Sequence, residues 1–288
     1  MVPCRLPVSG ALQGSAGFIQ VPGGAFTKDP ASDIAFPGAP DPSGLRRGYT
    51  YDPAAARWLP VPPDYVEPGL AWYVYVAADA SVPRLHRVEV ATGSDTLWPG
   101  GDRLQGYVTA ARPEGIYGAP GPEILQLVDP TGLLRTVDQG RYGLMALVTA
   151  TAYFETQWVH GSTYQLTDLV RVDAGTSTEQ VWFHRAGLVV LPIGIDAHGS
   201  PIVAVGKQDA RGRPVAQEIW IAPRPSTAER PTGTLVYSSV DQPLTILGQA
   251  RASAGMIFFE TGSGLYVWDG SALANASGFV GYVAGDCL

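Results

Sequence analysis

A strand-turn-strand pattern recurs along the whole chain, and this repeat constrains the fold more than any other feature. In each unit an apolar strand runs into a tight turn, and a second strand returns. The turns are Tyr51-Asp52-Pro53, Val90-Ala91-Thr92-Gly93, Val128-Asp129-Pro130-Thr131-Gly132, Val172-Asp173-Ala174-Gly175, Ile221-Ala222-Pro223 and Trp268-Asp269-Gly270. The intervals between Asp52 and Asp269 average about 43 residues, a period typical of four-stranded radial units rather than of helical solenoids.

A second landmark keeps the same order, because a glycine opens an apolar, β-rich run upstream of most of these turns. The runs are Gly17-Phe18-Ile19, Gly69-Leu70-Ala71-Trp72, Gly115-Ile116-Tyr117, Gly199-Ser200-Pro201-Ile202 and Gly255-Met256-Ile257-Phe258, while Ala152-Tyr153-Phe154 lacks its glycine. The sequence therefore predicts an all-β fold, a single β-propeller of six blades with four antiparallel strands each. We expect the blades near residues 1–62, 63–100, 101–140, 141–186, 187–240 and 241–288.

Composition and turn chemistry agree with this prediction. The chain has 35 glycines and 25 prolines, and no segment sustains a helical apolar period over several turns. We expect the carboxylates of Asp52, Asp129, Asp173 and Asp269 to accept hydrogen bonds from their own turns. The longest irregular segment, residues 23–48, is interpreted as an ordered surface loop.

The two cysteines, Cys4 and Cys287, lie at opposite ends of the chain, and the first and last blades of a propeller must meet. We expect a disulfide between them to lock the ring; the alternative is two free thiols. Residues 279–283 are interpreted as the outer strand of the last blade. On that interpretation the ring needs no strand exchange, and the disulfide replaces it.

A disulfide indicates an oxidising compartment, so we expect an extracytoplasmic protein, secreted, periplasmic or on the cell surface. Met1 to Cys4 show neither a basic start nor an apolar segment, so we expect any export signal to be missing from this sequence. The longest apolar run, residues 188–195, is too short to span a bilayer. A net charge of −7 argues against nucleic acid as a partner. Lys28 and Lys207 are the only lysines, a bias that indicates a GC-rich bacterial genome.

At its glycine landmarks the chain resembles bacterial six-bladed propellers of the TolB-like and WD40-like kind. Members of that group often carry a Ser-Pro-Asp-Gly turn before the second strand, and Glu67-Pro68-Gly69 and Asp196-Ala197-His198-Gly199 come near it. The runs Cys4-Arg5-Leu6-Pro7-Val8 and Arg57-Trp58-Leu59-Pro60-Val61 are similar to those of uncharacterised exported propellers. The resemblance implies the fold and transfers no catalytic residue.

Catalytic signatures are missing from the sequence. It contains no Gly-x-Ser-x-Gly elbow, no His-Glu-x-x-His pair and no phosphate-binding loop. The histidines, His86, His160, His184 and His198, lack the short spacing of metal ligands on one element. We therefore expect no catalytic residue, no metal site and no cofactor.

The tryptophans allow two interpretations, because an indole can stack on a sugar or pack inside a sheet. Trp58, Trp98 and Trp182 fall on presumed outer strands, and Trp220 and Trp268 fall on third strands. We expect these five to pack between strands. Trp158 differs, because it lies where a second strand gives way to a loop.

Loop length selects one face of the predicted ring. The loops between second and third strands share a face with the connections between blades, and they are long at residues 23–48, 158–165 and 207–216. Function tends to lie on long loops held by a rigid scaffold. The candidate ligand-binding residues are Asp29, Asp33, Arg46, Arg47, Trp158, His160, Lys207, Arg211 and Arg213.

Three functions stay open at this point. The first is a non-catalytic module that binds a protein, a peptide or a glycan on the long-loop face. The second is a polysaccharide-acting hydrolase or lyase, with acid and base from different blades at the central channel. The third is a subunit of a homomeric extracellular assembly, suggested by a charged fraction of only 16%. Polar groups that converge in the channel would favour the enzyme over a scaffold.

Overall fold

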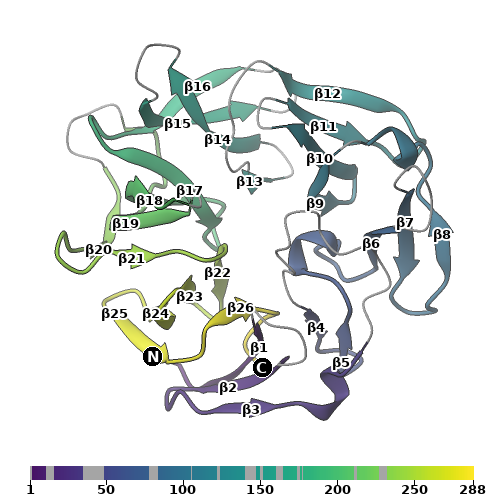
Figure 1. The fold of residues 1–288 in the computed structure, drawn as a ribbon, viewed down its shortest axis with the longest axis horizontal. Helices are drawn as coiled ribbons and strands as arrows, with labels where there is room; N and C mark the ends of the chain where they lie inside the picture. The colour runs from purple at the N-terminus through teal and green to yellow at the C-terminus, as the bar shows by residue number, and fades with distance from the viewer. Residues whose placement is uncertain are drawn as a thin grey trace.

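The structure, a computed structural model, shows sheets that follow one another around a common axis (Figure 1). It describes residues 2–10, 16–34, 49–77, 84–104, 106–121, 124–139, 147–149, 152–159, 165–173, 176, 178–210, 213–226 and 232–288. The helical elements in these ranges are the short 3-10 turns η1 (Pro30–Ser32), η2 (Pro63–Tyr65) and η3 (Gly101–Arg103). None of these described helices has the length and apolar character needed to cross a membrane. The prediction of an all-β propeller is confirmed.

Three sheets and one hairpin make up the first half of the chain. The first sheet orders its strands β26 (Gly281–Val283), β1 (Cys4–Gly10), β2 (Ala16–Val21) and β3 (Phe26–Lys28). The hairpin is β4 (Thr50–Asp52) and β5 (Arg57–Leu59), and the next sheet is β6 (Trp72–Ala77), β7 (Arg84–Glu89) and β8 (Asp95–Leu97). The third sheet is β9 (Tyr107–Arg112), β10 (Gly115–Gly121), β11 (Ile124–Val128) and β12 (Leu134–Gln139).

The second half begins with the sheet β13 (Leu147–Val148), β14 (Ala152–Val159), β15 (Gln165–Asp173) and β16 (Glu179–His184). Then follow β17 (Val189–Ile195), β18 (Pro201–Gln208), β19 (Pro214–Ile221) and β20 (Thr234–Ser238), with β21 (Leu244–Thr245) added on β19. The last strands are β22 (Ala250–Ser253), β23 (Met256–Thr261), β24 (Gly264–Trp268) and β25 (Leu273–Ser277). Parallel pairing of β17 with β22 joins the last two groups. Gly194 allows this approach, because a side chain there would collide with the carbonyl of Ala250.

The ring closes through its two chain ends. β26 pairs antiparallel with β1, with Val8 opposite Val283 and Gly10 opposite Gly281. The Cys4–Cys287 disulfide is present, as predicted, with 5.5 Å between the two Cα atoms. The seam between the ends therefore has a covalent link and a hydrogen-bonded strand pair.

The expectation that residues 279–283 form the outer strand of the last sheet is wrong, and so is the expectation of closure without strand exchange. The outer strand is β25, and β26 belongs to the first sheet. β25 has the sequence Leu-Ala-Asn-Ala-Ser, which is only weakly apolar. An outer strand needs no continuous apolar side, whereas the buried Val283 identifies β26 as an inner strand.

The segment 23–48 is also more structured than expected. β3 lies inside it and pairs with β2, with Ile19 opposite Phe26. Residues 35–48 lie outside the described residues. The Tyr51 turn belongs to the β4–β5 hairpin. This hairpin is bonded to the end of the first sheet, because the Tyr51 N–H donates at 2.7 Å to the carbonyl of Ala284, which follows β26.

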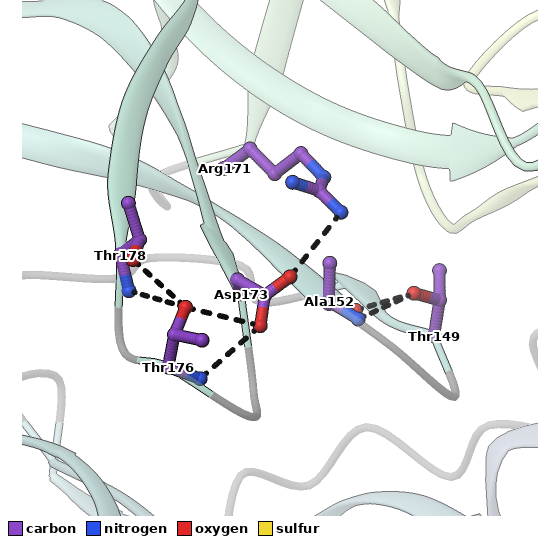
Figure 2. A network of polar contacts seen from close by, with 6 residues as sticks. All are labelled: Thr149, Ala152, Arg171, Asp173, Thr176 and Thr178. Carbon is purple, nitrogen blue, oxygen red and sulfur yellow. Dashed lines mark hydrogen bonds and ion pairs between the residues drawn. The ribbon is translucent and has the colours of Figure 1, made fainter.

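The four predicted aspartate turns are confirmed, since each carboxylate accepts backbone N–H groups of its own turn. Figure 2 shows one of them, in which Asp173 Oδ1 accepts the N–H and hydroxyl of Thr176. Thr149, in the turn before β14, lies near it in the same view. The turn between inner strands and the turn between outer strands thus emerge at one end of this sheet.

Two of these turns hold their carboxylates ionised. The Ser271 hydroxyl, helped by the Ala272 and Ser271 N–H groups, lowers the pKa of Asp269 well below its usual range. The Thr131 hydroxyl, followed by backbone N–H groups of the turn, likewise lowers the pKa of Asp129. A lowered pKa in the folded state stabilises the fold above the unfolded-state pKa, and that contribution disappears as the pH falls through the folded-state value.

Replacing both cysteines (Cys4→Ser with Cys287→Ser) should leave the ring closed, because β26 still pairs with β1. It should lower the free energy of unfolding by up to about 5 kcal/mol, the chain-entropy limit for so long a loop. Denaturant unfolding measures this, with the reduced wild-type protein as a control that should match the variant. An unfolding midpoint equal to that of the oxidised wild type would contradict the expectation.

Asp269→Asn should destabilise the fold at neutral pH, since the amide lacks the charge that the turn's donors favour. The stability difference from wild type should be constant above about pH 5 and shrink as the pH falls through 4 and below. Urea unfolding over a pH series measures this. Ser271→Ala removes the largest cause of the shift and should act in the same direction. A difference that grows on acidification would refute the assignment.

Candidate functional site

The described members of the predicted loop face mostly have local structural partners. Asp29 caps η1 through the Ala31 N–H and accepts the Trp58 indole N–H, both at 3.0 Å. Asp33 forms an ion pair with Lys28 at 2.9 Å. These contacts shape the loop after β3. A ligand that contacted Asp29 or Asp33 would therefore contact carboxylates that already have partners within the protein.

The remaining predicted residues lie around other loops. Arg213 pairs with Asp209 at 2.6 Å across the β18–β19 turn, and Lys207 is exposed near the end of β18. Trp158 belongs to β14, but its side chain is not described. Arg46, Arg47, His160 and Arg211 lie outside the described residues. The ligand-binding role of the nine residues stays a prediction.

The five tryptophans expected to pack in the sheets, Trp58, Trp98, Trp182, Trp220 and Trp268, do so. Trp58 and Trp98 are buried, and Trp182, Trp220 and Trp268 pack against hydrophobic clusters. Two of them also link neighbouring sheets through their ring N–H groups. Trp98, which follows β8, donates to the carbonyl of Asp129 at 3.2 Å, and Trp182 on β16 donates to that of Ala222 at 2.8 Å. In both cases the indole reaches the turn after the third strand of the next sheet.

The histidines that the structure describes lie apart from one another. His86 Nδ1 is 2.8 Å from Asp95 Oδ1, and His184 Nδ1 contacts Asp168 on the neighbouring strand. Within the described ranges, no three His, Cys, Asp or Glu side chains come together in a way that could hold a metal ion.

Polar groups converge instead at the inner strands, around a cavity of about 80 Å³ that we call the inner cavity. Its polar lining includes Asp64 from η2, Arg251 from β22, Glu260 from β23 and Tyr282 from β26, together with Gln249, which precedes β22. β22 and β26 lie toward the middle of the ring in Figure 1. Residues far apart in the chain therefore meet where the inner strands face one another.

Arg251 and Asp64 form the ion pair of the inner cavity. Arg251 Nη2 lies 3.2 Å from Asp64 Oδ1, although the two residues are 187 positions apart. Arg251 Nε is buried and has no hydrogen-bond partner among the described residues. Among the described residues, Nη2 of this guanidinium therefore has an acceptor and Nε has none.

Glu260 connects the cavity to the seam. Its side chain is buried, with 2% of the residue exposed, and its Oε1 accepts the Val283 N–H at 2.6 Å. Gly248 fits against the other oxygen, where a side chain would collide with the carboxylate. Glu260 therefore holds β23 to β26 and at the same time presents a carboxylate to the cavity.

A second guanidinium lies nearby at the end of β9. Burial lowers the pKa of Arg112, and the neighbouring carboxylates of Asp64 and Glu114 act against this, while the positive charge of Arg251 adds to it. On the neighbouring strand, burial and then Glu114 raise the pKa of Tyr117 to about 12. Three carboxylates, those of Asp64, Glu114 and Glu260, and the guanidinium groups of Arg112 and Arg251 thus lie in or near the cavity.

The cavity lies at the end of the ring where the sheets are connected. Its lining includes Pro62, which precedes η2, and Pro63, which begins it, as well as residues 247–249, which lead into β22. In these antiparallel sheets the entry to an inner strand lies at the same end as the turn between the second and third strands, such as residues 209–213. The inner cavity and the predicted long-loop face therefore share one end.

Sequence reasoning missed Asp64, Arg251, Glu260 and Tyr282. Glu260 gives a weak signal, because it follows the apolar run Met256–Phe259 in a strand that is buried along its whole length. Arg251, Asp64 and Tyr282 look like ordinary strand or loop residues. Only the closed ring brings these four together.

No protein-family model matches the chain, and no curated protein matches its sequence. Among solved structures it is similar to TolB from Acinetobacter baumannii (TM-score 0.46, 12% identity), over 94% of this chain and 62% of that one, so it spans less than two thirds of TolB. A nidogen/laminin complex has TM-score 0.48 and 14% identity over 93% and 89%. The β-propeller domain of the trilobed protease from Pyrococcus furiosus has 0.48 and 9% over 94% and 83%. The fold assignment rests on the strand order and closure described above.

Glu260→Ala should lower the free energy of unfolding by about 1–3 kcal/mol, because it leaves the Val283 N–H buried without its acceptor. Glu260→Gln keeps an acceptor oxygen and should cost less. Thermal and urea unfolding measure both variants. Equal losses in the two variants would show that the hydrogen bond to Val283 is not what Glu260 contributes.

Proposed function

We propose that this chain is a non-catalytic binding module that takes a peptide or protein ligand at the end of the ring that carries the inner cavity. The surface includes the long-loop residues Asp29, Asp33, Arg46, Arg47, Trp158, His160, Lys207, Arg211 and Arg213, with the cavity at its centre. One observation carries the proposal, namely the convergence of Asp64, Arg251, Glu260 and Tyr282 on one cavity.

The size of the cavity decides what kind of ligand fits. Pockets for whole small molecules measure roughly 300–1,000 Å³. At about 80 Å³, the inner cavity has room for a single group and not for a whole cofactor or sugar ring. A group that enters it is therefore part of a larger molecule, whose remaining contacts fall on the surrounding loops.

Several finer proposals accompany this function. We propose six blades, with β17–β20 and β22–β25 as separate blades joined by the β17–β22 pair, in a bacterial TolB-like propeller. The disulfide supports an extracytoplasmic location, because such bonds persist in oxidising compartments. Assembly into homomers stays a secondary proposal, supported by exposed apolar side chains such as Val240, 73% of which is exposed.

A polysaccharide-acting hydrolase or lyase is the second candidate, favoured by two carboxylates, Asp64 and Glu260, in one cavity. Their contacts favour binding instead. Asp64 pairs with Arg251, and Glu260 accepts a backbone N–H that closes the ring. Release of reducing ends from a polysaccharide panel, lost in Asp64→Asn, would replace the binding proposal with this one.

Selection from a random peptide library displayed on phage, beside a glycan array, tests the proposed function. Gln249→Trp should block the inner cavity and abolish binding of the selected peptides. Gln180→Trp, on the exposed outer strand β16, is the matched control and should bind like wild type. Ligands that bind all three proteins equally would refute the site, and glycans as the only ligands would refute the peptide class.

A further inference from the structure

We infer that the Cys4–Cys287 disulfide controls the inner cavity, which binds its ligand when the disulfide is formed and binds it more weakly when the disulfide is reduced. The inference rests on the proposed binding function and adds its regulation. It starts from the position of Cys287, since only residues 284–286 separate this cysteine from β26. β26 supplies two residues of the cavity lining, Tyr282 and Val283.

The disulfide fixes the segment that follows β26. It joins Cys287 to Cys4, the first residue of β1. Beside it the backbones of Arg5 and Leu288 exchange hydrogen bonds of 3.1 and 3.2 Å. β26 is thus attached twice to β1, by strand pairing and, just beyond its last residue, by a covalent bond.

Cys287 also contacts a second strand that lines the cavity. Its N–H donates to Ser253 Oγ at 2.9 Å, and Ser253 is the last residue of β22. β22 carries Arg251, which belongs to the lining. One cysteine therefore fixes both the segment after Tyr282 and the end of the strand that bears Arg251.

Without the disulfide, β26 depends on the non-covalent contacts of a very short strand. It has three residues, which pair with Val8, Ser9 and Gly10 of β1. The Val283 N–H also donates to Glu260 Oε1 at 2.6 Å. Segments held by a few hydrogen bonds open locally more often than the whole molecule unfolds. The covalent tether suppresses this opening because it keeps β26 beside β1, so reduction raises the population of an open β26.

Opening of β26 changes the affinity of the cavity. It removes Tyr282 and Val283 from the lining, so the open form lacks the complete site. The apparent affinity falls in proportion to the fraction of molecules in which the site is closed. Linkage requires the reverse effect as well, so a peptide that binds the closed cavity makes the disulfide harder to reduce.

The redox step is a thiol–disulfide exchange with a dithiol. Cys4 is 7% exposed and Cys287 is only partly buried, so Cys287 offers the more accessible end. A thiolate of the dithiol attacks the Cys287 sulfur and forms a mixed disulfide, while Cys4 leaves as a thiolate and takes up a proton. The second thiolate of the dithiol then displaces Cys287, which is protonated in turn. Two electrons pass to the protein, and the dithiol becomes a disulfide.

Backbone hydrogen exchange measures the opening without a ligand. The probe is the Val283 amide, compared with the core amides of β18 in the same molecule, because loss of global stability alone acts on both. In wild type reduced with dithiothreitol, the Val283 amide should exchange at least about tenfold faster relative to the β18 amides than in the oxidised protein. An unchanged ratio would overturn the inference.

Calorimetry with a peptide from the library selection measures the affinity. The reduced wild type and the variant with Cys4→Ser and Cys287→Ser should bind this peptide roughly tenfold more weakly than the oxidised protein. Leu169→Ala removes a buried core side chain of β15 but keeps the disulfide, so it controls for lost stability and should bind like oxidised wild type. In wild type the peptide should also raise the dithiothreitol concentration needed to reduce half of the disulfide.

The outcomes separate the inference from the proposed function. Equal affinity of the oxidised and reduced proteins, or an equal loss in Leu169→Ala, would overturn the redox control. If the selected peptides still fail to bind Gln249→Trp, the binding function stands without it. If no peptide binds the oxidised protein at all, both fail.

Discussion

The pairing of β26 with β1 is the contact on which the rest of this structure depends. Each sheet buries its faces against its neighbours, so an open ring would leave one face of the first sheet and one of the last exposed to water. The seam instead forms a continuous core, in which Leu6, Val8 and Ile19 pack with Phe258, Val267 and Val283. Arg5 and Leu288 exchange two backbone hydrogen bonds beside it, and the disulfide fixes the same two segments.

The seam also builds the candidate site. Tyr282 reaches the inner cavity because β26 is the innermost strand of the first sheet, and Glu260 is held there by the same N–H of Val283 that marks the closed ring. The ion pair of Asp64 and Arg251, also in the lining, joins η2 to β22. The contact between Glu260 and Val283 therefore both closes the ring and fixes Glu260 at the cavity. A ligand that engages Glu260 would act on this contact.

Local chemistry could be predicted from the sequence, and contacts across the ring could not. The turn aspartates were predictable because their acceptors and donors lie within a few residues, as for Asp129 and Thr131. The disulfide followed from topology alone, since the ends of a closed ring must meet. The role of β26 could not be predicted in this way. β25, the outer strand of the last sheet, is only weakly apolar and gives little strand signal in the sequence. Asp64 and Arg251 gave no signal, because their pairing requires the complete ring between them.

The aspartate turns and the inner cavity differ in how their polar groups are satisfied. At the end shown in Figure 2, each aspartate turn satisfies its own carboxylate through neighbouring N–H and hydroxyl groups. Such turns are complete without a ligand. At the other end the β18–β19 turn is also satisfied locally, by Asp209 and Arg213, but the polar groups of the inner cavity come from separate sheets. Their contacts join those sheets, as the Asp64–Arg251 and Glu260–Val283 pairs show. Within that arrangement Arg251 Nε is buried without an acceptor among the described residues. The polar groups of the aspartate turns thus depend on neighbouring residues, whereas those of the inner cavity come together only when the sheets have assembled.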